Sequence, residues 1–151
     1  MRIRKIAAMF AAGVVMVGGQ ALADDLTLSK GDATDLIESD VGKPYWQMEA
    51  QCAGMFGAAY AYEMDRQHPR EAERSKDSGI AMLNEAIARL QADRGLDQPA
   101  ALNLAAVEVE TGRAAAKLGL DRQGSGGGSY FNFMRSACFD ISAAQRKHMA
   151  P

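Results

Sequence analysis

The chain has 151 residues, a length that fits a single domain. Hydrophobic residues make up 48% of it and charged residues 24%, which excludes wholesale disorder. Two cysteines are too few for a disulfide-dense scaffold. The formal net charge of −2 disfavours binding to nucleic acid or to an anionic membrane surface, because both depend on clustered Lys and Arg.

The N-terminal residues have the three regions of a secretory signal peptide. Residues 2–5 carry three basic side chains, and residues 6–19 are uncharged but shorter than the roughly 20 residues of a membrane span. Residues 21–23 then give the small-x-small pattern of a cleavage site. We therefore expect Sec-type export to the periplasm and cleavage after Ala23. Cleavage removes three of the 17 basic residues, which leaves 14 against 19 acidic ones and a net charge of −5.

The mature chain, 24–151, is expected to form one helical domain without a membrane span. Residues 24–43 are polar, and within them 32–38 are compatible with a short helix. The helical body then covers residues 44–148.

The first long helix is predicted from Pro44 to about residue 67. Proline suits the first turn because its missing N–H has no partner there. Glu49 is the only charge between Pro44 and Tyr62, so this helix should be buried on most of its surface. Its small residues form a ridge that would let another helix approach closely: Ala50, Gly54, Ala58 and Ala61.

Two further helices are predicted from proline and glycine punctuation. One runs from Pro69 to about Arg94 and stops at Gly95, and the next begins near Asp97 and ends at about residue 118. Gly112 should weaken the middle of the latter. The expected buried stripes are Ile80, Leu83, Ala86, Ile87 and Leu90 in the former, and Leu102, Ala105, Ala106, Val109 and Ala116 in the latter.

The last helix is predicted from Tyr130 to about Lys147. Residues 124–129 are rich in glycine and predict a flexible connection before it, with Ser129 as its cap. Its buried stripe should be Phe131, Met134, Ala137, Cys138, Ile141 and Ala144. No alternating run indicates a strand, so the expected fold is all-α: a four-helix bundle with a short extra N-terminal helix.

The two cysteines lie on the inward faces of the first and last main helices. In an exported protein such a pair indicates a disulfide, Cys52–Cys138, which would link those two helices. An alternative is a soft-metal site, because Met48 and Met134 each stand four residues before a cysteine. Two thiolates and two thioethers are ligands suited to Cu(I).

Motifs for catalysis are absent from the sequence. His68 and His148 have no partner at metal-ligand spacing, and Glu108 and Glu110 are only two residues apart and point to different helix faces. There is no G-x-S-x-G nucleophile motif. We therefore expect no enzyme activity and no cofactor.

The remaining indication is a set of aromatic side chains on the first and last helices. Phe133 and Phe139 fall off the buried stripe, and with Trp46 and Tyr60 they could form a binding surface. The leading interpretation is a non-enzymatic interaction or binding module with a protein partner in the cell envelope. The alternatives are a small-molecule or Cu(I) binder, with a cavity among Trp46, Tyr60 and the methionines, and a periplasmic stress chaperone.

Overall fold

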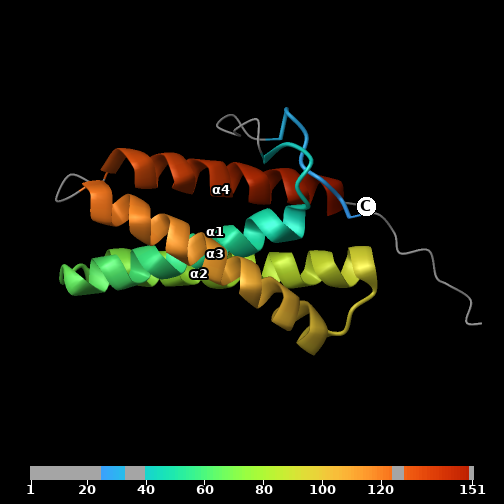
Figure 1. Cartoon of the computed structure of the whole chain (residues 1–151), viewed down its shortest axis with the longest axis horizontal. Coiled ribbons are helices and arrows are strands. Elements are labelled where there is room, and N and C mark those ends of the chain that lie inside the picture. The colour runs from blue at the N-terminus through green and yellow to red at the C-terminus, as the bar shows by residue number, and fades with distance from the viewer. Residues whose placement is uncertain (1–24, 33–39, 124–127, 150–151) are drawn as a thin grey trace, which may run out of the picture.

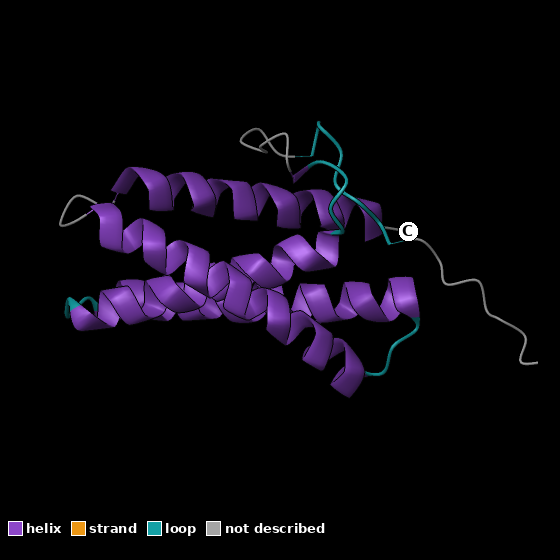
Figure 2. Cartoon of the chain, viewed as in Figure 1, coloured by secondary structure: helices purple, strands orange, loops and turns teal. Residues whose placement is uncertain are grey.

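Four helices dominate the structure, a computed structural model that describes residues 25–32, 40–123 and 128–149. They hold 83% of these residues, and no strand occurs among them, so the all-helical prediction is confirmed (Figure 2). The expected helix over 32–38 and the glycine-rich connection lie mostly outside the described residues. The helices are α1 (Tyr45–Asp65), α2 (Pro69–Arg94), α3 (Gln98–Gln123) and α4 (Gly128–Met149).

Proline and glycine set most of the observed helix ends. Pro69 occupies the first turn of α2, and Gly95 ends that helix in the left-handed conformation at φ 63°, where its N–H donates to the carbonyl of Gln91. The Asp97 side chain accepts the N–H of Ala100 at 2.9 Å, which caps the start of α3. α3 continues past its expected end at about residue 118 and reaches Gln123.

The central element is α1, which contacts α2, α3 and α4 (Figure 1). In Figure 1, α4 runs along one side of the molecule and α2 along the other, and α3 passes obliquely across α1 and α2 toward the start of α4. α1 is buried along most of its length from Tyr45 to Ala59, as its wide apolar face predicted. No helix in the described part of the chain is apolar over a stretch long enough to cross a membrane.

Two glycines allow α1 and α3 to cross backbone against backbone. A Cβ atom on Gly54 would lie 1.8 Å from the carbonyl oxygen of Val109, and one on Gly112 would lie 1.9 Å from that of Gln51. The small-residue ridge of α1 therefore does bring a second helix close. Gly112, expected to weaken α3, is instead the position that its contact with α1 requires.

The close crossing also changes which face of α3 is buried. The expected stripe is wrong at Leu102, which is 43% exposed, and at Ala106, which is also exposed. Large apolar side chains would hold the two backbones apart, so small residues face the core. The buried residues of α3 are Ala101, Ala105, Gly112, Ala116 and Leu120. In α2, Ile80 is 51% exposed and likewise lies outside the core.

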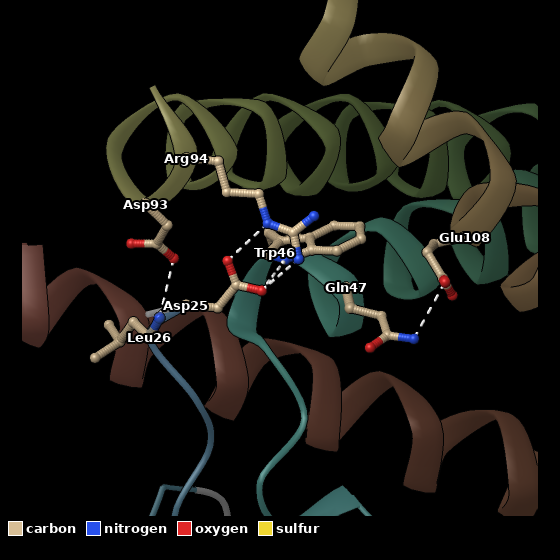
Figure 3. Close-up of polar contacts among 7 residues, drawn as sticks. All are labelled: Asp25, Leu26, Trp46, Gln47, Asp93, Arg94 and Glu108. Atoms are coloured by element: carbon tan, nitrogen blue, oxygen red, sulfur yellow. Dashed lines mark hydrogen bonds and ion pairs between the residues drawn. The ribbon is translucent and has the colours of Figure 1, made fainter. Parts of the chain in front are cut away.

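The N-terminal strap, residues 25–28, is fastened to the helices (Figure 3). The Asp25 carboxylate accepts hydrogen bonds from Arg94 at 2.8 and 2.6 Å and from the Trp46 indole at 3.2 Å. The Leu26 N–H donates to Asp93 at 3.0 Å. Leu28 is buried, so the strap adds an apolar contact to these polar ones.

Candidate functional site

Cys52 of α1 and Cys138 of α4 form a disulfide with a Cα–Cα distance of 5.7 Å, which confirms that prediction. The bond joins residues 86 positions apart in the sequence. In the chain-entropy model, closing a loop of this length stabilises the fold by about 4–5 kcal/mol. The disulfide lies in a core cluster that also contains Met55, Phe56, Met82 and Leu120.

The candidate copper ligands do not form one cluster. Met134 packs against the disulfide cluster, whereas Met48 belongs to a neighbouring cluster with Tyr45 and Ile141. The two cysteine sulfurs are bonded to each other, so neither is a thiolate that could bind Cu(I). Over the described ranges, no group of three His, Cys, Asp or Glu side chains is placed to hold a metal ion.

The four aromatic residues proposed as a binding surface lie in different surroundings. Trp46 is a correction: it is only 5% exposed, because it packs in the core and donates its N–H to Asp25. Tyr60 is half-buried. Phe133 and Phe139 are 39% and 40% exposed, as their position off the stripe predicted.

A pocket of about 490 Å³ opens where α1 ends and α2 and α4 begin. Its floor is apolar and contains the buried Phe56 and Leu120 together with the half-buried Phe131. Phe56 and Leu120 also belong to the disulfide cluster, so the Cys52–Cys138 bond holds the helices that form this floor. The volume lies within the range of sites that bind small organic molecules.

The rim of the pocket is charged. Arg66, Arg74 and Arg135 line it and are exposed. Glu63 lines it as well, and its Oε2 atom lies 2.8 Å from Nδ1 of His68. The pocket therefore combines an aromatic floor with ionic groups at its opening, an arrangement that suits an amphipathic ligand.

A second unusual feature is the carboxyl group of Glu49, which is completely buried on α1. Within the described part of the chain, neither of its oxygens nor Oε1 of Gln145 has a hydrogen-bond partner. Burial, and next the neighbouring Glu85, raise the pKa of Glu49 to about 9. With this pKa, Glu49 is protonated at neutral pH.

Glu85 of α2 is bound from α4. Its carboxylate accepts hydrogen bonds from the Ser142 hydroxyl and from Arg146 at 2.7 Å. Charges from α2 and α4 thus surround the Glu49 carboxyl, which lies outside the lining of the pocket. No sequence motif predicts that Glu49 and Glu85 lie close together. The only local indication is that Glu49 is a single charge within an apolar helix.

Comparisons with protein-family models, with curated protein sequences and with solved structures give no match to this chain. No residue role is therefore transferred from a relative. The candidate site stands on the geometry of the pocket between α1, α2 and α4.

Proposed function

We propose that this chain is an exported, non-enzymatic binding module of the periplasm, whose ligand site is the pocket between α1, α2 and α4. The observation that carries the proposal is a cavity of about 490 Å³ with an aromatic floor and a charged rim. Export is supported by the signal-like residues 1–23 and agrees with a disulfide, which forms in oxidising compartments.

A binding role suits the pocket better than catalysis. Glu63 lies beside His68 as in a catalytic dyad, but no hydroxyl group of the described residues hydrogen-bonds to the imidazole. The hydroxyl residues Ser75 and Ser78 line the same cavity without such a contact. The buried Glu49 has no access to this cavity, which supports a structural role for it.

The disulfide supports a pocket that is formed before the ligand arrives. We propose that the four helices act as a four-helix bundle in which Cys52–Cys138 fixes α4 against α1. The pocket floor draws on residues of α1, α3 and α4, so its shape depends on that attachment. A preformed site binds more tightly because less ordering is required on binding.

The test is native mass spectrometry of the protein purified from the envelope of its own host without reductant. We expect the mass of residues 24–151 less two hydrogens, together with a small bound molecule. Asn132→Trp should abolish the added mass because Asn132 lines the pocket, whereas Asn103→Trp on the exposed surface of α3 should not. A protein without added mass in both variants and in the wild type would contradict the proposal.

A second candidate is a protein-interaction module that uses α4. The exposed rings of Phe133 and Phe139 favour it, because both are large apolar side chains at the surface of α4. The same mass spectra test it. A co-purified protein that is lost in Phe133→Ser, with no small molecule present, would favour the interaction module over the pocket.

A further inference from the structure

The charges around the pocket indicate the chemical class of its ligand. Arg66 follows the end of α1, Arg74 lies on α2 and Arg135 lies on α4, so three separate segments bring a guanidinium group to one opening. In the described part of the chain, no carboxylate lies within ion-pair distance of any of the three. Their N–H donors are therefore available to an anion from outside.

Aromatic rings position two of these guanidinium groups. Arg66 lies over the ring of Tyr62, with its Cζ atom 4.2 Å from the ring centroid, and Arg135 lies 5.7 Å from the centroid of Phe139. Stacking on a ring orients a guanidinium without occupying its N–H groups at the edge. The pocket thus presents two guanidinium groups oriented by rings, and no carboxylate within the described ranges forms an ion pair with either.

Two carboxylates on the rim limit the charge of the ligand. Glu63 is engaged with His68, and Glu71 lies in the first turn of α2, where the helix dipole favours a negative charge. The three arginines and the two glutamates that line the pocket leave it with a net charge of about +1. A ligand with one negative charge matches it, whereas each further charge would meet repulsion from these carboxylates.

The floor requires that the ligand also has an apolar body. Phe131 is half-buried and, with the almost fully buried Phe56 and Leu120 beside it, offers apolar surface that an inorganic anion would leave uncovered. A neutral amphiphile would leave the arginine donors unused, and a cation would be repelled by them. Charge and apolar surface together select an organic monoanion.

We propose that the pocket binds monoanionic amphiphiles, namely organic carboxylates with an aliphatic or aromatic body. The apolar body would lie on Phe56 and Phe131, and the carboxylate would accept hydrogen bonds from Arg74 and Arg135 at the rim. This inference rests on the proposed binding function and specifies the ligand class for that same site.

The experiment compares three probes of equal chain length on the disulfide-bonded protein: decanoate, decanol and decyltrimethylammonium. The two ionic probes are kept below their micellar concentrations, and decanol is kept below its solubility limit. Affinities come from isothermal titration calorimetry, and the site is mapped by amide chemical shifts in NMR spectra. We expect decanoate to bind about tenfold more tightly than decanol, with the ammonium probe weakest. The shifts should gather at residues that line the pocket.

Charge variants separate contact with the anion from the overall field of the protein. Arg74→Gln and Arg135→Gln should each weaken decanoate binding by about tenfold and leave decanol binding unchanged. Arg113→Gln is the control, because it removes the same charge from an exposed position on α3 outside the pocket. It should leave the affinity for decanoate unchanged.

Each other outcome overturns the inference in an identifiable way. Equal binding of decanoate and decanol, unchanged by the two arginine variants, would reject the anionic class and keep the pocket as an apolar site. Tighter binding of decyltrimethylammonium than of decanoate would show that the pocket prefers cations. If none of the probes shifts the pocket signals, the ligand class is wrong. The proposed function fails with it only if native mass spectra also show no bound molecule.

Discussion

Replacing Glu49 by Gln should make the protein more stable at neutral pH and flatten its dependence on pH. The Glu49 carboxyl is completely buried. Burial, and next the Glu85 carboxylate, raise its pKa to about 9 from the usual 4.5. At pH 7 the folded protein therefore holds a proton on Glu49, whereas the unfolded chain has released it.

The sign and size of the effect follow from this difference in bound protons. Between pH 4.5 and about 9 the folded state binds one proton more than the unfolded state, so the free energy of unfolding falls as pH rises. Each pH unit in this window is worth about 1.4 kcal/mol, which amounts to about 3 kcal/mol between pH 4.5 and 7. A glutamine has no such proton. We expect Glu49→Gln to match the wild type near pH 4 and to exceed it by about 3 kcal/mol at pH 7.

The assay is urea unfolding of both proteins at one-unit steps from pH 4 to pH 8, followed by circular dichroism with the disulfide intact. Glu85, Arg146 and the other charged groups near this site are common to the two proteins, so the difference between their unfolding free energies isolates Glu49. Glu110→Gln, at an exposed carboxylate on α3, is the matched control and should follow the wild type. Parallel curves for Glu49→Gln and wild type across this range would refute a protonated Glu49.

The remaining predictions concern packing, the disulfide and the strap. Gly54→Ala and Gly112→Ala should each lower the free energy of unfolding by about 2–3 kcal/mol, because the added methyl group would clash with the backbone of the facing helix. Gly57→Ala is the control in the same urea titration, because its methyl group would meet only the end of the Arg113 side chain. The double variant Cys52→Ala, Cys138→Ala should lose about 2–5 kcal/mol in that assay and weaken the binding of decanoate. Hydrogen bonding to Arg94 lowers the pKa of Asp25 despite partial burial, so the stability this carboxylate contributes is present above its usual pKa and is lost as pH falls. Asp25→Asn should therefore destabilise the protein more at pH 7 than at pH 3, measured by thermal unfolding at both.

Local signals in the sequence were sufficient for the helices and the disulfide. Pro69 and Gly95 punctuate α2 in a way that depends on backbone geometry alone, and the observed ends agree with the prediction. The cysteine pair follows from the inward faces of two helices. Burial within α3 was not predictable in this way. A hydrophobic stripe weights large side chains, whereas the backbone contact at Gly112 places small ones inside and Leu102 outside.

The candidate site depends on contacts between distant segments, which the sequence does not display. Arg66, Arg74 and Arg135 look like ordinary surface residues until the fold brings them to one opening. The prediction that Trp46 belongs to a binding surface is wrong. Its hydrogen-bond partner, Asp25, lies in a polar segment with no helical pattern, so the sequence does not show that the two residues meet. Glu49 is the exception, because the sequence itself marks it as unusual: it is a single charge in an apolar helix.

With the proposed cleavage after Ala23, the N-terminal strap would impose an order on maturation. Asp25 is anchored by Arg94 and Trp46, and only Asp24 separates it from the expected cleavage after Ala23. A peptidase needs an accessible, extended segment on both sides of the bond it cuts, and a docked strap does not offer one. Cleavage should therefore precede docking, so that the new N-terminus joins the fold as a late step. Pulse labelling followed by protease digestion would show this order as processed chains that become protease-resistant only afterwards.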